Sequence, residues 1–432
     1  MKDSFKRVII FLTLVSLIFL SPSRLSAETA LNDALVHETG RYTLKLALVG
    51  PGDELYFWWG HMGLVVEDNQ TGRARFFDWG IFDWESENFL VNFAFGRLYY
   101  YCAVVPAELY YNALLNNNRD VSLYTLNLPM DKILEVIRFA ENNVLPENRT
   151  YNYHHFLDNC ATRIRDIIDI AVDGQFSSEF GSTPSRFSLR QQVRRHTWQS
   201  PFFDWFLSFL MGQDIDRLIY VWEDMFLPSE IILRVMDFEY TGEDGITRPL
   251  ISAAHTMNQS QGRPIVLDEP RLLWPTLLVF SIAVSFLLLV FYAKGRTLKH
   301  YRKLMGSIIC LLGLFFGIAG SILFFMTFFT AHDYTYNNSN VIFINPLMLA
   351  AIPLGIFFGF SGNVKNQHAV IRLLRILWAY VFLGGLLAMT LRILPAFSQQ
   401  DVSSQALIMP IALVFVIILT RLKKEGHNYE KK

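Results

Sequence analysis

The hydrophobic positions divide the chain into two parts of different character. Residues 28–270 mix polar and apolar positions as soluble domains do, whereas the last third contains apolar runs long enough to cross a membrane as helices. Five such runs lie at about 273–293, 304–329, 341–361, 374–394 and 406–421, and a short tail at 422–432 follows them. The pattern predicts an all-α transmembrane domain of about five helices at 271–421, preceded by a separate globular domain.

Period-two alternation predicts the strands of the globular domain. The predicted strands lie at 42–49 (where a short helix is the alternative), 60–66, 73–79 and 99–105. The second and third of these flank the turn-rich sequence DNQTG, which is typical of a hairpin. His61 lies near the beginning of this hairpin and Asp78 near its end, so we expect the two side chains to be roughly opposite each other.

Helical spacing predicts helices at about 106–117 and 130–144 and a further one that begins near Cys160. In this last helix the apolar positions Ala161, Ile164, Ile168 and Ala171 recur every three or four residues. Strands and helices together make the domain α+β. Between 177 and 265 lie helical pieces rich in Phe and Trp, such as 205–211, which fit an ordinary core better than a membrane surface.

Cys160 is the strongest candidate for chemistry in the chain. Asp158 or Asn159 can cap the helix that starts there, and the positive end of the helix dipole favours a thiolate, as do the nearby arginines. A nucleophilic thiol also needs a base and a group that orients the base. We assign these roles to His61 and Asp78, while His154 and His155 in the preceding loop are rival bases.

Composition and charge indicate on which side of a membrane these groups lie. The first residues resemble a secretory signal peptide, 1–27, with cleavage expected after Ala27, and a net charge of −1 gives no case for nucleic-acid binding. The basic residues concentrate in the loop at 294–303, around the loop between the third and fourth spans (Lys365, Arg372 and Arg375) and at the C-terminus, so the positive-inside rule places residues 28–270 outside the cytoplasm. Only three cysteines occur: Cys310 lies in a span, while Cys102 and Cys160 could pair, although a nucleophile must be free.

Several motifs resemble those of one family. The run from Glu147 to Tyr153, the sequence DNCATR at 158–163, the phrase WGHMGL at 59–64 and the phrase FDWGIFD at 77–83 are similar to the Lnb-type lipoprotein N-acyltransferases. The resemblance implies an exported papain-like thiol domain of the NlpC type at 28–270, joined to a multi-span membrane domain. The order of His before Cys is similar to the permuted arrangement of lecithin:retinol acyltransferase.

The resemblance also implies roles for particular residues. His61 becomes the base, Asp78 the orienting group and Cys160 the nucleophile, although relatives commonly have a histidine in the place of Asp78. Tyr151 and Arg163, within the motif around Cys160, are expected to contact substrate. The polar loop between the second and third spans ends in an Asn-Pro pair, and its candidates for binding a lipid headgroup are His332, Asn338 and Asn345.

The expected reaction is acyl transfer at the outer face of the inner membrane. A membrane phospholipid would donate an acyl chain to Cys160, and a diacylglyceryl lipoprotein would accept it on its α-amine; no cofactor and no metal are required. Two alternatives remain open from the residues alone. One is a membrane-anchored cysteine amidase or peptidase acting on cell-wall peptides, and the other is a non-catalytic receptor or scaffold in which Cys160 is structural.

Overall fold

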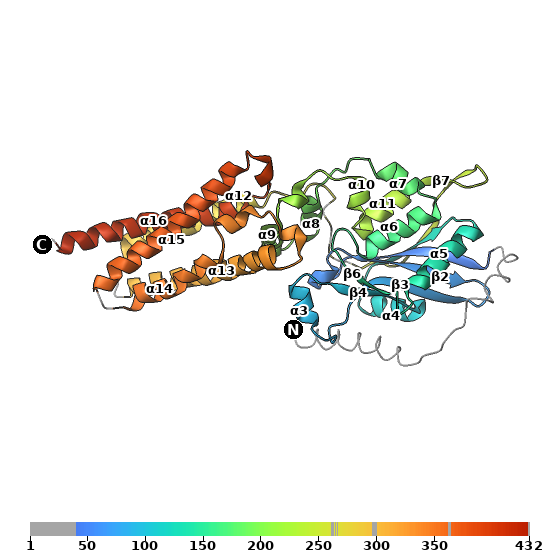
Figure 1. Ribbon diagram of the computed structural model, residues 1–432, viewed down its shortest axis with the longest axis horizontal. Coiled ribbons are helices and arrows are strands. Elements are labelled where there is room, and N and C mark those ends of the chain that lie inside the picture. The colour runs from blue at the N-terminus through green and yellow to red at the C-terminus, as the bar shows by residue number, and fades with distance from the viewer. Residues whose placement is uncertain are drawn as a thin grey trace. The chain divides into compact units, whose positions relative to one another are not determined.

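The computed structural model describes residues 40–430 apart from 261–262, 264, 266, 296–299 and 362–363. The expected signal peptide and its cleavage site lie outside the described residues. The described chain forms two compact units (Figure 1). The described residues of the first, called here the sheet unit, lie within 40–93, 97–186 and 219–265, and those of the second, called the membrane unit, lie within 94–96, 187–218 and 267–430.

A seven-stranded antiparallel sheet forms the centre of the sheet unit. Its strands are β1 (Tyr42–Val49), β2 (His61–Asp68), β3 (Arg73–Ile81), β4 (Tyr99–Pro106), β5 (Val121–Leu126), β6 (Thr150–Asn152) and β9 (Ile251–Asn258). Their order across the sheet is β6-β4-β3-β2-β1-β5-β9. The alternation at 42–49 therefore belongs to a strand, and β2 and β3 pair as the hairpin that the sequence predicts.

The helices of the sheet unit cover both faces of this sheet. They are α3 (Phe89–Ala94, whose last residue belongs to the membrane unit), α4 (Ala107–Asn116), α5 (Met130–Asn143), α6 (Cys160–Ala171), α7 (Gln175–Phe180), α10 (Val221–Asp224) and α11 (Pro228–Val235), with a 3₁₀ turn, η2, at Leu55–Phe57 and a small hairpin of β7 (Glu239–Thr241) and β8 (Thr247–Pro249). The α+β class is as the sequence predicts.

Side chains alternate between the two faces along each central strand, because successive residues of a strand point to opposite sides. Leu64 and Phe77 belong to the large core shared with α5, α6 and α11. Val65 and Phe76 point the other way and pack with Ala107 at the start of α4. Ala161, Ile164, Ile168 and Ala171 of α6 are at most 1 % exposed, which fixes this helix firmly on the sheet.

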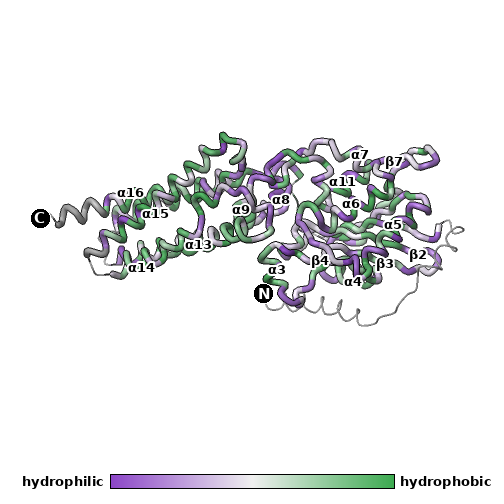
Figure 2. Tube along the Cα trace, viewed as in Figure 1, coloured by the Kyte–Doolittle hydropathy of each residue, from purple (hydrophilic) through white to green (hydrophobic). Residues whose placement is uncertain are grey.

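Within its described residues the membrane unit contains five segments long and apolar enough to cross a membrane, and Figure 2 shows their hydrophobic colouring. Its helices are α8 (Leu189–Thr197), α9 (Pro201–Leu210), α12 (Trp274–Gly295), α13 (Tyr301–Phe329), α14 (Ala351–Phe360), α15 (Val364–Leu391) and α16 (Ser403–Glu430), and its 3₁₀ turns are η3 (Gln213–Asp216), η4 (Asp333–Thr335), η5 (Ser339–Ile342), η6 (Pro346–Ala350) and η7 (Pro395–Phe397). The five segments correspond closely to the apolar runs of the sequence.

The third of these segments is not one regular helix. It begins with η5 and η6 and becomes α-helical only at Ala351. Gly320 of α13 explains the close fit of its irregular half, because a Cβ atom there would lie 2.6 Å from the backbone of Asn345. Small residues at such contacts let two membrane segments approach closely.

The boundary expected at residue 270 does not separate the two units, because residues 187–218 belong to the membrane unit. They fold with the membrane helices: Trp205 and Phe209 are buried in the membrane unit's core, and Trp205 Nε1 donates to Ser404 Oγ at 3.2 Å. The Phe- and Trp-rich pattern predicts that these side chains are buried in a core, and that core is the one of the membrane unit. Local periodicity shows which face of a helix is buried and not which partner buries it.

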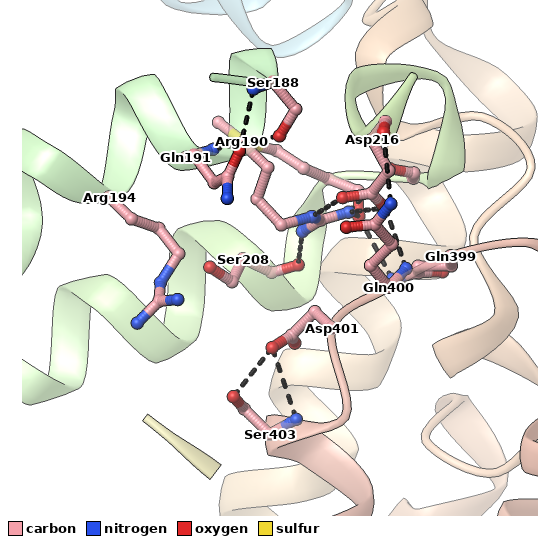
Figure 3. A network of polar contacts seen from close by, with 12 residues as sticks. Ser188, Arg190, Gln191, Arg194, Ser208, Asp216, Gln399, Gln400, Asp401 and Ser403 are labelled. Carbon is pink, nitrogen blue, oxygen red and sulfur yellow. Dashed lines mark hydrogen bonds and ion pairs between the residues drawn. The ribbon is translucent and has the colours of Figure 1, made fainter. Parts of the chain in front are cut away.

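A buried ion pair holds this segment in place (Figure 3). Arg190 donates to both carboxylate oxygens of Asp216 and to the carbonyls of Ser208, Met211 and Gly212. The backbone N–H of Gln400 donates to Asp216 at 3.0 Å, which ties the segment to the loop before α16. These contacts satisfy the charges that burial would otherwise penalise.

Candidate active site

His61 and Asp78 meet across the β2–β3 hairpin. Gly63 is the residue paired directly with Asp78, and His61 lies two positions before Gly63 on the same face. His61 is therefore the diagonal neighbour of Asp78, and its Nε2 lies 2.7 Å from Asp78 Oδ1. The side chains are 18 % and 10 % exposed, so this hydrogen bond is shielded from most of the solvent.

Tyr110 of α4 is a second partner of Asp78 that the sequence analysis did not identify. Its ring stacks on Phe76 at 3.9 Å between centroids, and its hydroxyl forms a hydrogen bond with Asp78. Burial raises the pKa of Tyr110 well above its usual value, and the charge of Asp78 adds to the rise. A buried carboxylate requires more than one donor, but nothing in the sequence indicates which hydroxyl supplies it.

Cys160 is the first residue of α6, as the sequence predicts. The cap is Asn159, whose side-chain oxygen accepts from the N–H groups of Ala161 and Thr162 at 2.9 Å each, while Thr162 Oγ1 accepts from the Asn159 N–H. This capping box does not use the N–H of Cys160. Asp158, the alternative cap, instead holds Arg163 through both carboxylate oxygens.

Cys160 and His61 interact directly. Burial alone lowers the pKa of His61, but the charge of Asp78 and the charge of a Cys160 thiolate, each with a side-chain hydrogen bond, raise it well above its usual value. Because Nε2 faces Asp78, Nδ1 is the ring nitrogen that remains for the thiol. The hairpin and the helix start therefore bring the three predicted residues together in the order Asp78–His61–Cys160.

Gly80 shapes the wall beside the thiol. The register of β3 against β4 shifts between Trp79 and Ile81, and Gly80 adopts a φ of +94° within this bulge. A Cβ atom at Gly80 would lie 3.9 Å from the Cβ of Cys160 and 3.7 Å from the ring of Tyr153. Bulges often re-aim a strand next to an active site, and this one needs glycine because of its positive φ.

Tyr151 lies at the same place. Its hydroxyl is 3.9 Å from the Cβ position of Gly80 and is buried without a hydrogen-bond partner within the described chain. Burial raises the pKa of Tyr151 well above its usual value, and the charges of Tyr153 and Cys160 add to the rise, so the hydroxyl keeps its proton. The guanidinium of Arg163 lies over the ring at 4.4 Å, held there by Asp158.

The rival histidines are engaged in loop structure. His154 Nδ1 accepts from the backbone N–H groups of Phe156 and Leu157 at 3.1 and 3.0 Å, and the ring of His155 packs edge-on against Tyr153. Cys102, on β4, is 1 % exposed, and burial raises its pKa. All three cysteines of the chain are free thiols in the structure.

The other three predicted residues belong to the membrane unit. His332 is 5 % exposed, and its Nδ1 lies 3.1 Å from the hydroxyl of Tyr334. Asn338 caps η5 and donates to the carbonyl of Phe209, while Asn345 caps η6 and donates to the carbonyl of Val341. The two asparagines thus use both their oxygen and their nitrogen to shape this irregular segment.

A polar cavity of about 420 Å³ also lies in the membrane unit. Gln213, Asp214, Asp216, Arg217, Ser398 and Gln400 line it. None of these is a predicted site residue, and Asp216 already pairs with Arg190. We therefore assign this cavity to the packing of the membrane unit.

Two family models match the chain. Residues 40–198 match the family model of the Lnb N-terminal periplasmic domain, and residues 268–424 match that of the Lnb transmembrane domain. No curated protein and no solved structure matches the chain. The two matched domains cover about three-quarters of the sequence and describe a multi-pass inner-membrane protein with a periplasmic N-terminal domain, and the chain belongs to the Lnb family.

Proposed function

We propose that the chain is a lipoprotein N-acyltransferase with a cysteine nucleophile. It moves an acyl chain from a membrane phospholipid, through a thioester on Cys160, to the α-amine of the S-diacylglyceryl cysteine of a bacterial lipoprotein. The observation that carries the proposal is the series Asp78–His61–Cys160, in which a shielded carboxylate lies 2.7 Å from the imidazole that couples to the thiol. Membership of a family that has a transmembrane domain supports a substrate embedded in lipid.

The first half-reaction forms the thioester. His61 Nδ1 takes the proton of the Cys160 thiol, and the sulfur attacks the carbonyl carbon of a phospholipid ester. The tetrahedral intermediate collapses when the C–O bond to glycerol breaks, and the imidazolium gives its proton to the departing oxygen. The products are a lysophospholipid and an acyl group on Cys160, and Asp78 stabilises the imidazolium between these two steps.

In the second half-reaction the same groups transfer the acyl chain from Cys160 to the lipoprotein. The neutral α-amine of the lipoprotein attacks the thioester carbonyl, and the bond between carbon and sulfur breaks. The nitrogen proton passes to His61 and from there to the Cys160 sulfur, so that an amide forms and the free thiol is regenerated. No step needs a redox partner or a metal ion.

Two donors are placed to stabilise the oxyanion of both intermediates. One is the N–H of Cys160, which the capping box does not use. The other is the hydroxyl of Tyr151, which is buried and unpaired within the described chain and, like the Cβ of Cys160, lies 3.9 Å from the Cβ position of Gly80. Arg163 positions the Tyr151 ring and adds positive potential, while its own charge is paired with Asp158.

Reconstitution tests the proposal. The full-length protein is placed in vesicles with a diacylglyceryl lipoprotein, and the N-terminal lipopeptide is analysed by mass spectrometry. We expect N-acylation with the wild type and none with Cys160→Ala. Cleavage of a cell-wall peptide without any N-acylation would favour the amidase, and the absence of both activities would favour the non-catalytic receptor.

A further inference from the structure

An apolar surface on the sheet unit extends from α3 to the surroundings of Cys160. The sequence FLVNFAF at 89–95 contains no charged residue. Leu90 is 71 % exposed and Val91 54 %, and Trp84 just before the helix is 44 % exposed. Large side chains exposed side by side in this way are uncommon on soluble domains and mark a binding surface.

Aromatic rings connect these residues to the proposed nucleophile. Phe89 of α3 stacks on Phe82 at 5.8 Å, Phe82 packs on Tyr100 at 5.0 Å, and Tyr100 stacks on Tyr153 at 4.4 Å. The Tyr153 ring in turn lies beside Gly80, and the Cβ of Cys160 is another neighbour of this glycine. The series begins at the half-buried Phe89, next to the exposed Leu90, and ends beside Gly80 and the Cβ of Cys160.

We infer that this surface, formed by Trp84, Leu90 and Val91 with the ring series of Phe89, Phe82, Tyr100 and Tyr153, receives the acyl chain of a membrane phospholipid and guides its ester to Cys160. The inference rests on the proposed function and adds the place where the donor enters. An apolar surface of this kind replaces the hydrocarbon surroundings that an acyl chain loses when it leaves the bilayer, so the chain is not exposed to water on its way to Cys160.

The chain's own connectivity favours lipid over a soluble peptide as the occupant. Ala94, the last residue of α3, and the next two residues belong to the membrane unit, where the carbonyl of Phe95 accepts from the N–H of Ala331 and the ring of Phe95 packs on Phe325 of α13. The apolar surface is thus continuous in sequence with a segment that contacts a membrane-spanning helix.

Acidic residues beside the apolar surface also indicate which part of a phospholipid it binds. Asp83, Glu85 and Glu87 are exposed in the turn before α3, and these acids would repel a surface of purely anionic lipid. Their presence indicates that the surface takes up the hydrocarbon chain itself and does not bind an anionic headgroup. A basic, membrane-attracted helix would show the opposite charge pattern.

Photocrosslinking tests the inference separately from the reaction. Full-length Cys160→Ala is reconstituted in vesicles of phosphatidylethanolamine and phosphatidylglycerol that contain a phosphatidylethanolamine with a diazirine at the end of one acyl chain. After irradiation, peptide mass spectrometry should locate crosslinks within residues 82–93. Because this variant cannot turn over, the crosslinks do not depend on whether the chain is an acyltransferase.

A matched pair of substitutions gives the second readout. Leu90→Glu should reduce these crosslinks at least tenfold and, in the background with Cys160 intact, slow acylation by vesicle phospholipid while leaving alkylation of Cys160 by iodoacetamide unchanged. Leu233→Glu is the control, because Leu233 of α11 is 55 % exposed and away from the ring series. The absence of crosslinks within 82–93, or equal effects of the two substitutions, would overturn the inference.

Discussion

Replacing Asp78 with asparagine removes one negative charge from the site and keeps the size of the side chain. Burial lowers the pKa of His61, and among the groups that raise it the charge of Asp78 contributes most. An asparagine whose amide donates to Nε2 forces the ring proton onto Nδ1, the nitrogen that faces the thiol. The variant therefore loses both the support of the imidazolium and the tautomer that accepts a proton.

The expected size of the effect follows from these two losses. A hydrogen bond to a charged group contributes about 1.5–3 kcal/mol, which corresponds to a factor of roughly 10–100 at about 1.4 kcal/mol per decade. The wrong tautomer is the larger loss, because it prevents general-base action, which is worth roughly 10²–10⁴ in rate, and the two losses overlap because both act through the same imidazole. We expect Asp78→Asn to slow acylation of Cys160 by about 10²–10⁴.

The same substitution changes the pH dependence in a defined direction. At high pH the rate falls when the imidazolium loses its proton and no longer protonates the departing glycerol oxygen. Asp78 raises the pKa of His61, so removing its charge lowers that pKa and moves the alkaline limb to lower pH. The wild type should keep its activity well above pH 6.5, the usual value for histidine.

The assay is the rate of acyl-enzyme formation from a phosphatidylethanolamine with a fluorescent acyl chain, quenched at set times and measured from pH 5 to 10. Asp83→Asn is the control, because Asp83 is an exposed carboxylate just beyond the same strand. A rate for Asp78→Asn within tenfold of the wild type, together with an unmoved alkaline limb, would refute the role of Asp78.

Three further substitutions test other parts of the account. Tyr151→Phe should slow acylation by about 10²–10³ and leave alkylation of Cys160 by iodoacetamide unchanged, since it removes one oxyanion donor; equal losses in both would point to a damaged fold. His332→Ala should reduce transfer to lipoproteins more than it reduces Cys160 alkylation, and no loss in either assay would remove His332 from the site. Asp216→Ala should lower the free energy of unfolding in detergent by about 3–5 kcal/mol, because it leaves the buried charge of Arg190 unpaired, and an unchanged unfolding midpoint would contradict the role of that ion pair.

The parts of the site that the sequence predicts are those fixed by local pattern. Alternation and a turn-rich sequence specify the hairpin, and the hairpin alone brings His61 beside Asp78. Helical spacing and a capping residue specify the start of α6 and so the position of Cys160. That the hairpin and the helix bring His61 and Cys160 together is predicted only by the chemistry and the family resemblance, because no local pattern encodes it.

The features that the sequence does not predict depend on contacts between segments far apart in the chain. Tyr110 reaches Asp78 only because α4 packs on the face of the sheet that carries Phe76 and Asp78. Residues 187–218 join the membrane helices because Trp205 and Phe209 find their partners there. The hydropathy pattern does not reveal the 3₁₀ turns of the third span, because the segment as a whole is about as apolar as the other spans.

The most direct test of the central claim is to isolate the acyl-enzyme. The full-length protein in vesicles is incubated with phospholipid and without a lipoprotein acceptor, quenched in acid and analysed as peptides by mass spectrometry. The account predicts that the peptide with Cys160 gains the mass of one acyl group, that hydroxylamine removes it, and that addition of a diacylglyceryl lipoprotein discharges it. Acyl transfer to lipoprotein without any acyl group on Cys160 at any time would contradict it.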